Sequence, residues 1–217
     1  MQKYRVAKRF GWDGEITAKA RSVMKMFGLD MDRLKQNSPI HECSVELRAG
    51  DICYITGASG AGKSVLLREL YAQAAPEMRL WLEKIELEDE GSVIDGIEGD
   101  FFEALRVLGK AGLSDVFAVL NRPVSLSDGQ KYRYRLAKAL ASGRKMIFAD
   151  EFCSSLDRIS AAVIAFNIHK FAKRNAVSFV LASSHDDLLS DLLPDVVVIK
   201  HLAGKAEVIY RDGRRKA

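Results

Sequence analysis

The distribution of apolar residues along the chain predicts strands and helices in alternation. Four short runs are apolar and rich in β-branched side chains, as buried strands are. These runs are residues 51–56, 145–149, 177–183 and 196–200. Three longer segments carry apolar residues at helical spacing, namely residues 65–72, 129–141 and 159–173. Strands that alternate with helices favour a mainly parallel sheet.

The N-terminal segments are less regular. Residues 4–10 and about 16–27 alternate partially around the turn-forming residues 11–14. This pattern predicts a β-hairpin, with a helix as the alternative for its second arm. A polar excursion over residues 28–39 then precedes residues 41–47, which alternate again. We therefore expect antiparallel strands before the parallel ones.

Two further segments complete the expected elements. Residues 79–86 and 207–210 predict additional strands, the second of them at a sheet edge. Residues 101–120 have helical spacing and predict two short helices interrupted at Gly112. No internal repeat or low-complexity segment is present.

Composition places the chain among ordinary globular proteins. Of its 217 residues, 48% are apolar and 29% are charged. No stretch is long and apolar enough to span a bilayer, and residues 1–6 lack the apolar core of a signal peptide. We therefore expect a cytoplasmic protein. The net charge of +4 is mildly basic and does not by itself indicate nucleic-acid binding.

Three scattered cysteines, Cys43, Cys53 and Cys153, form neither a metal-ligand pattern nor a disulfide framework. Cys53 lies in an apolar run and is expected to pack as a small hydrophobe. Cys153 lies beside an acidic pair, so a reactive thiol is the alternative to packing there.

The clearest chemical motif is Gly57-Ala58-Ser59-Gly60-Ala61-Gly62-Lys63-Ser64, which fits the phosphate-loop pattern G-x-x-x-x-G-K-[ST]. A predicted strand precedes the motif and a predicted helix, beginning near Val65, follows it. Glycines let backbone N–H groups turn toward phosphate, and the helix N-terminus favours an anion. Lys63 can reach the β- and γ-phosphates, and Ser64 can place a hydroxyl on Mg²⁺. The motif predicts that the chain binds ATP with Mg²⁺.

A second motif is the strand Met146–Ala149 followed by Asp150 and Glu151. An apolar strand that ends in a carboxylate is the partner expected of a phosphate loop. Asp150 can hold Mg²⁺ through water, and Glu151 can orient the attacking water. A strand that merely ends in a charged turn is the alternative.

A third motif, Leu126-Ser127-Asp128-Gly129-Gln130, opens a basic and apolar helix. Here the sequence resembles the ATP-binding cassette (ABC) ATPases, whose signature Leu-Ser-Gly-Gly-Gln it matches at all positions but the third. Residues 150–157 resemble the Walker B and D-loop of that family, and residues 181–186 resemble the strand that ends in its switch histidine. The resemblance covers about residues 23–200.

The resemblance implies a head-to-tail dimer with ATP between the phosphate loop of one copy and the signature of the other. Ser127, Gly129 and Gln130 would then contact the γ-phosphate across the interface. Asp157 would couple the two sites, and His185 would contact the γ-phosphate beside Glu151. Lys63, Glu151 and His185 are the implied catalytic residues.

Two further positions are open to alternative interpretations. Phe27 lies where an aromatic ring stacks on adenine in the family, if residues 29–39 are an insertion. A core aromatic is the alternative for Phe27. His185 at a strand end could also be an ordinary surface histidine.

The sequence also departs from the family. Asp128 replaces a glycine, and we expect it to cap its own helix. No glutamine occurs between Gln73 and Gln130, so the Q-loop glutamine that reads a transmembrane partner is missing or replaced. Asp95 is the candidate for its place, as a third metal-site residue with Ser64 and Asp150. An ordinary loop acid is the alternative for Asp95.

We therefore expect an α/β P-loop NTPase fold of the ABC type. Its sheet would be mixed, mainly parallel and flanked by helices, with an N-terminal antiparallel β subdomain and a small helical lobe. Residues 1–217 would form a single domain. Within it, residues 1–50 are the β subdomain, residues 51–86 and 141–210 the nucleotide-binding core, and residues 87–140 the shortened lobe that carries the signature.

The expected function is MgATP binding, homodimerisation around two nucleotides and hydrolysis that drives a conformational change in a partner. The shortened lobe without a Q-loop glutamine favours a protein or nucleic-acid partner over a membrane partner. The first alternative is the nucleotide-binding subunit of an ABC transporter. The second is an ATP-dependent dimerisation module with little turnover.

Overall fold

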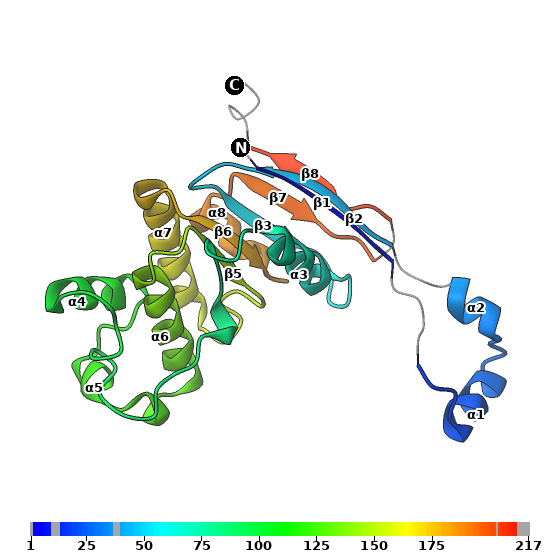
Figure 1. Ribbon diagram of the computed structural model, residues 1–217, viewed down its shortest axis with the longest axis horizontal. Helices are drawn as coiled ribbons and strands as arrows, with labels where there is room; N and C mark the ends of the chain where they lie inside the picture. The colour runs from blue at the N-terminus through cyan, green and yellow to red at the C-terminus, as the bar shows by residue number, and fades with distance from the viewer. Residues whose placement is uncertain (1, 10–13, 37–39, 203, 212–217) are drawn as a thin grey trace.

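A six-stranded sheet forms the centre of the protein in the computed structural model, which describes residues 2–9, 14–36, 40–202 and 204–211 (Figure 1). Its strands run in the order β4-β5-β6-β3-β7-β8. They are β4 (Arg79–Trp81), β5 (Met146–Ala149), β6 (Ser178–Ala182), β3 (Ile52–Thr56), β7 (Val196–Ile199) and β8 (Glu207–Tyr210). All pairs are parallel except β7 with β8. The predicted α/β fold with a mixed, mainly parallel sheet is confirmed.

The central strands are apolar throughout because both faces of the sheet are covered. Every residue of β3 is buried, and alternate residues enter two different clusters. Ile52 and Tyr54 join the cluster that contains α6 (Asp128–Ala141) and α7 (Arg158–Asn175). Cys53 and Ile55 join the cluster that contains α3 (Lys63–Gln73) and the N-terminal strands. The sheet is therefore the middle of three layers.

A separate two-stranded sheet lies over the α3 side. β1 (Gln2–Arg9) pairs antiparallel with β2 (Ile40–Leu47), from Gln2 opposite Leu47 to Arg9 opposite Ile40. This pairing makes the predicted hairpin between residues 4–10 and 16–27 wrong. The partner of β1 is the alternating segment at residues 41–47, whose inward side chains are buried.

The chain between β1 and β2 forms two short helices instead, α1 (Ala18–Met26) and α2 (Met31–Gln36). Thr17 caps α1 by accepting a hydrogen bond from the backbone N–H of Ala20. No side chain of α1 is buried, so this segment lacks the apolar face that a strand of the core would need. Figure 1 shows α1 and α2 projecting from the end of β1 and β2.

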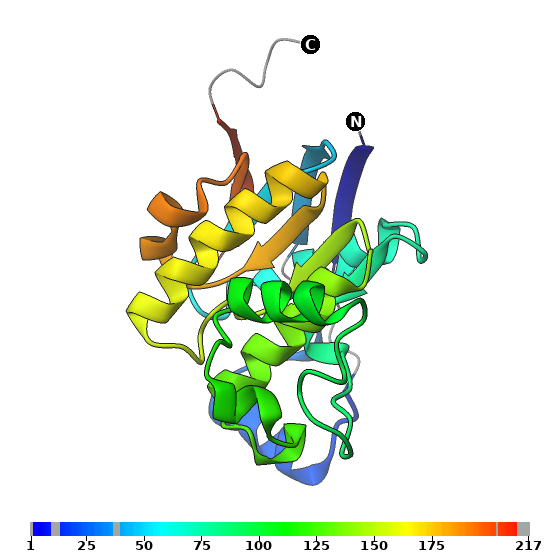
Figure 2. The ribbon, with the colours of Figure 1, turned by 90° about the vertical axis from the view of Figure 1, so that its left-hand side faces the viewer.

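A helical lobe lies at the other end of the molecule. It contains α4 (Phe101–Lys110), α5 (Val116–Leu120) and α6, with the predicted interruption at Gly112 between α4 and α5. Figure 2 shows this green lobe beside α7, which lies across one face of the sheet. A further short helix, α8 (Leu189–Leu192), packs on α7. In the part of the chain that the structure describes, no helix combines the length and apolar character needed to cross a membrane.

Three one-turn 3₁₀ segments follow strands or precede helices: η1 (Leu82–Lys84), η2 (Pro123–Ser125) and η3 (Asp186–Leu188). The strand predicted for residues 79–86 is therefore shorter, because η1 begins directly after Trp81. Because β4 ends at Trp81, the residues of η1 lie at the carboxyl edge of the sheet. The parallel neighbours β5, β6 and β3 end at the same edge, which places residues 57, 150 and 183–185 close together.

We expect Phe148→Ala to lower the free energy of unfolding by about 3–5 kcal/mol. The Phe148 side chain is fully buried in β5, stacked on Trp81 and in edge contact with Tyr71. Removing it leaves a cavity in the middle layer. The matched control is Phe166→Ala on the outer face of α7, where the ring is 45% exposed and the expected loss is below about 1 kcal/mol. Urea denaturation followed by circular dichroism measures both, and equal losses would contradict this account of the core.

Candidate functional site

The glycine-rich turn between β3 and α3 is held in a backbone conformation that other residues rarely adopt. Gly57 has φ of 140°, and a Cβ there would lie 2.1 Å from the carbonyl oxygen of Lys200. Gly62 has φ of 94° and precedes α3, whose start has no side-chain cap. The N-terminus of α3 is therefore available to an anion, as a phosphate site requires.

Lys63 ties this turn to the neighbouring strand. Its side chain is buried, and its Nζ donates to the carbonyl oxygens of Gly57 at 2.9 Å and Ala58 at 3.1 Å. A third bond, of 2.9 Å, goes to the hydroxyl of Ser184, which follows β6. The ammonium group thus lies inside the curve of residues 57–63. Sequence reasoning missed Ser184, although it directly precedes the predicted switch histidine.

Ser64 and Asp150 meet across the sheet edge. The hydroxyl of Ser64 donates to Asp150 Oδ1 at 3.0 Å. Both side chains offer oxygen atoms, the donors that Mg²⁺ prefers. Among the described residues there is no group of three or more His, Cys, Asp or Glu side chains arranged to hold a metal. The donor set therefore fits an ion that takes its remaining ligands from phosphate and water.

Glu83 is a site residue that the sequence analysis did not identify. It lies in η1, and its Oε1 accepts a hydrogen bond of 3.1 Å from the backbone N–H of Asp150. Glu83 is partly exposed, and the partial burial of its carboxyl raises the pKa, which the negative charge of Asp150 raises further. The available signal was that Glu83 is the first acid after the strand at 79–81. The sequence alone does not show that this strand, β4, pairs with β5 in the sheet.

Asp95, the residue predicted for the metal site, lies elsewhere. Its carboxylate accepts hydrogen bonds from the backbone N–H and hydroxyl of Ser92, within a loop of the helical lobe. These bonds lower the pKa of Asp95. The nearby residues Glu88 and Lys138 line the same surface hollow. The structure therefore corrects this prediction: Asp95 stabilises a turn in its own loop, and Glu83 is the acid beside Asp150.

The turn after β5 has an unusual backbone. Glu151 has φ of 48° and Cys153 has φ of 58°, both in the left-handed region. The backbone N–H of Phe152 donates to the carbonyl of Ala182 in β6, at 2.8 Å, which holds the turn in place. Conformations of this kind concentrate at functional sites. The turn leaves the Glu151 side chain exposed at the same edge as Lys63 and Asp150.

Cys153, by contrast, is enclosed. Burial raises the pKa of its thiol to about 12, and its sulfur contacts the hydroxyl of Tyr132. A thiol that stays protonated is a poor nucleophile. These observations favour the packing interpretation of Cys153.

His185 follows β6 with its side chain exposed. Its backbone N–H donates to Ser183 Oγ at 3.2 Å, and its carbonyl accepts from the hydroxyl of Tyr54 in β3. Since the adjacent Ser184 bonds Lys63, the imidazole lies at the edge that carries the glycine-rich turn. The structure thus brings together the regions of Lys63, Ser64, Asp150, Glu151 and His185.

The signature residues lie at the start of α6, in the helical lobe (Figure 1). Ser127 caps this helix by accepting from the backbone N–H of Gln130 at 3.3 Å, and the Gln130 side chain accepts from the Ser127 N–H at 2.9 Å. Asp128 is therefore not the cap, which corrects the expectation. Gly129 packs closely, because a Cβ there would lie 3.3 Å from the Leu156 side chain.

Asp157 begins α7. Its Oδ1 accepts from the backbone N–H of Ser160 at 2.9 Å, and this hydrogen bond lowers the pKa of the Asp157 carboxyl. The side chain is exposed next to Leu156, which contacts the signature glycine. Within one chain, Asp157 therefore acts as the N-cap of α7.

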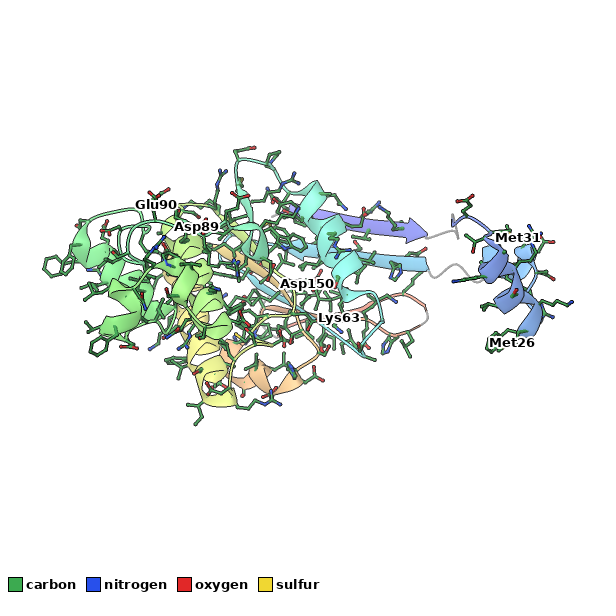
Figure 3. The ribbon with its side chains drawn as sticks, turned by 90° about the horizontal axis from the view of Figure 1, so that it is seen from below. Met26, Met31, Lys63, Asp89, Glu90 and Asp150 are labelled. Carbon is green, nitrogen blue, oxygen red and sulfur yellow. The ribbon has the colours of Figure 1, made fainter. Side chains whose placement is uncertain are left out.

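Phe27 is not brought to the site. It is the C-cap of α1 and is 65% exposed. Figure 3 shows the preceding residue, Met26, far from Lys63 and Asp150. The expectation that Phe27 stacks on adenine is corrected, because the insertion between β1 and β2 includes α1 as well as residues 29–39.

His41 is the residue that lies against the glycine-rich turn. A Cβ on Gly62 would lie 2.2 Å from Cε1 of the His41 ring, so glycine is required there. His41 is buried, and burial followed by the charge of Lys200 lowers its pKa. Its sequence signal was the alternation in β2, which places His41 on the same inward face as Cys43 and Val45.

Comparisons with known proteins extend these observations. No model of a known protein family matches the chain. The chain is 25% identical over 247 aligned residues to the phosphonates import ATP-binding protein PhnC 2 of Cupriavidus metallidurans, covering 91% of this chain and 87% of that protein. It is 30% identical over 186 residues to the aliphatic sulfonates import ATP-binding protein SsuB of Pseudomonas putida, covering 76% and 68%.

A solved structure has a similar fold. The post-hydrolysis dimer of the ATP-binding cassette MJ0796, bound to ADP and phosphate, superposes with a TM-score of 0.67 at 16% identity. The match covers 97% of this chain and 98% of that one. It supports the fold assignment independently of the sequence identity.

The names of the relatives overturn one expectation. Both are ATP-binding proteins of import systems, as is the methionine import protein MetN of Mannheimia succiniciproducens. The expectation that the ATPase serves something other than a transporter is therefore wrong, and the alternative of a transporter subunit is the better one. With the glycine-rich turn, the acids after β5 and the His185 segment at one sheet edge, and with these similarities along most of its length, the chain belongs to the ABC ATPase family of ATP hydrolases.

Proposed function

We propose that this chain is the ATP-binding and ATP-hydrolysing subunit of an import-type ABC transporter, with residues 1–217 acting as one ATPase domain. The observation that carries the proposal is the similarity to import ATP-binding proteins along 76–91% of the chain in the three relatives named above. In this role the subunit binds MgATP and couples its hydrolysis to a membrane-embedded partner.

The helical lobe offers a surface for that partner. At the start of α4 the side chains of Phe101 and Phe102 are 61% and 72% exposed, whereas Ala104 and Leu108 further along the helix are buried. Adjacent exposed aromatic rings at a helix start are unusual for a surface that faces only water, and they mark interaction sites. A capping box at Asp100 and Glu103 keeps this end of the helix formed.

Nucleotide binding follows from the charges of the site. The N–H groups at the start of α3 and the ammonium of Lys63 are positive, and both face the curve of the glycine-rich turn. Triphosphate placed there would replace the loop carbonyls and Ser184 as the partners of Lys63. Ser64 and Asp150 would hold Mg²⁺, which when bound neutralises charge on the β- and γ-phosphates.

The second copy supplies what one chain lacks. Ser127, Gly129 and Gln130 lie at the N-terminus of α6 in the helical lobe, whereas Lys63 lies at the edge of the sheet. A head-to-tail pair would bring each signature to the phosphate loop of the other copy. The helix N-terminus would then face the γ-phosphate. Asp157, between the two motifs, would link the sites.

Hydrolysis uses the carboxyl edge of the sheet. Glu151 would orient the attacking water, and His185 would contact the γ-phosphate beside it. Glu83 would replace the missing Q-loop glutamine, since its carboxylate touches Asp150 and follows β4 directly. A residue in that position lies between the metal site and the helical lobe, because η1 contacts both Asp150 and α6.

The first test is Glu151→Gln. This change keeps the shape of the side chain but removes the group that orients water, so we expect turnover to fall at least about a hundredfold with ATP binding retained. The variant should accumulate as an ATP-bound dimer in size-exclusion chromatography, whereas Lys63→Ala should bind no ATP. Full turnover of Glu151→Gln would contradict the assigned role.

The second test concerns Glu83. A raised pKa means that the folded protein takes up the proton more readily than the unfolded chain, so stability declines as pH rises through that pKa. Glu83→Gln removes this penalty. Without nucleotide, its gain in melting temperature should be larger at about pH 8 than near pH 4.5, the ordinary carboxyl value. The control Glu77→Gln, at an exposed carboxylate, should show no such trend. A gain for Glu83→Gln that does not vary with pH would refute the pKa shift.

The third test addresses the membrane partner. A photo-crosslinking amino acid at position 102 should form an adduct with an integral membrane protein in membranes of the source cell. Phe102→Glu should reduce the membrane-associated fraction of the chain severalfold, because it places a charge in an apolar contact. Leu202→Glu is a matched control at a side chain that is 69% exposed. If the chain is absent from the membrane fraction while Glu151→Gln still dimerises, the transporter assignment fails and the ATPase assignment stands.

A further inference from the structure

The helical pair between β1 and β2, residues 14–36, exposes apolar side chains far from the core. We call it the basic arm. Val23, Met26 and Phe27 are 54%, 76% and 65% exposed, and no side chain of α1 is buried. Each exposed apolar residue alone is ordinary, but three on one short element indicate a surface that is covered in the working protein.

The arm carries a net positive charge, with five basic and three acidic residues between positions 14 and 36, and its positive charge is concentrated on α1. α1 contains Lys19, Arg21 and Lys25 and no acidic residue. A helix that combines exposed apolar side chains with one sign of charge is suited to a partner that is both apolar and of opposite charge.

The opposite end of the same chain has the complementary character. Residues 85–105 contain eight acidic side chains and no basic one. Figure 3 shows Asp89 and Glu90 at one end of the molecule and Met26 and Met31 at the other, with Lys63 and Asp150 between them.

The part of this acidic segment that precedes α4, residues 85–100, lies directly against the segment that leads into the signature. The backbone N–H groups of Val93 and Ile94 donate to the carbonyls of Asn121 and Val119, at 3.0 and 3.2 Å. The guanidinium of Arg122 donates to the carbonyl of Asp89. The acids are thus fixed beside the approach to Ser127.

This segment exposes apolar side chains of its own. Phe117, Leu120 and Val124 are 83%, 65% and 55% exposed. Together with Asp89 and Glu90 they form what we call the acidic face. The acidic face combines negative charge with exposed apolar side chains, and the basic arm combines positive charge with exposed apolar side chains.

We propose that the basic arm of each copy docks on the acidic face of the other copy in the ATP-bound dimer. The proposal rests on the head-to-tail dimer of the proposed function. In that dimer the phosphate-loop end of one chain meets the signature end of its partner. The basic arm projects from the phosphate-loop end, and the acidic face flanks the signature, so the two meet twice by symmetry.

An anionic lipid surface is the other chemistry that would attract a basic helix with apolar residues. The second copy is favoured because this same chain carries a surface of matching charge and apolar content at the end that head-to-tail pairing brings to the arm. The apolar contacts would supply most of the affinity, since exposed ion pairs contribute little individually, and the charges would set the orientation.

The main experiment measures the dimer dissociation constant with ATP in the Glu151→Gln background, by analytical ultracentrifugation. Reversing Arg21 and Lys25 to Glu should weaken the dimer about tenfold, and so should reversing Asp89 and Glu90 to Lys. Combining all four reversals in one chain should restore most of the affinity, because opposite charges again face each other. Reversing Lys170 and Arg174 on α7 is the control, with no change expected.

A second measurement tests contact directly. The native cysteines are buried, so a chain with Met26→Cys and a chain with Phe117→Cys each carry one accessible thiol among the described residues. When the two chains are mixed with ATP, a bismaleimide should join them, and without ATP the yield should fall severalfold. A single chain cannot form this product.

The outcomes separate the two proposals. If Glu151→Gln forms no dimer with ATP, the dimer of the proposed function fails and the arm contact fails with it. If the dimer forms with unchanged affinity in all reversal variants and no cross-link appears, only the arm contact is overturned. Loss of binding to phosphatidylglycerol vesicles by the arm variant, with the dimer unchanged, would overturn it in favour of a lipid surface.

Discussion

The site depends on one constraint, the close approach of the glycine-rich turn to the strands beside it. The carbonyl of Lys200 and the ring of His41 occupy the space that side chains at Gly57 and Gly62 would need. Because no other residue fits, the turn is held in a left-handed conformation that directs the start of α3 and the Lys63 ammonium into one small region. Positive charge is concentrated there before any nucleotide arrives.

The remaining groups reach this region through the order of the strands. β6 ends beside β3 and β5 ends beside β6, so Ser184 bonds Lys63 and Asp150 bonds Ser64 across the sheet edge. β4 ends early and brings Glu83 to Asp150. The edge thus holds positive charge on the turn and negative charge on the strands next to it, which is the arrangement that a metal-bound polyphosphate needs.

Most of the central fold was predictable from the sequence, because buried parallel strands and amphipathic helices have strong patterns of their own. The turn at residues 57–64, the acids after β5 and the helix that follows Ser127 were found for the same reason, although the cap was assigned to Asp128 instead of Ser127. The predictions fail where the outcome depends on which strands pair or on which residues from distant parts of the chain lie close together. Partial alternation at residues 16–27 could not reveal that β1 pairs with residues 40–47 instead. Asp95 was chosen by its position in the chain, although a hydrogen bond to Ser92 holds it in the helical lobe.

The sequence by itself indicated the chemistry: it contains residue types suited to binding phosphate, holding a metal and orienting water, together with a signature-like helix start. Local patterns suffice for this, because glycine turns, caps and strand ends act over a few residues. Only the tertiary structure decided that Glu83 and Ser184 join the site, that Phe27 does not, and that His41 lies against Gly62. These outcomes depend on which strands become neighbours, and that is set by the burial of apolar surface over the whole chain.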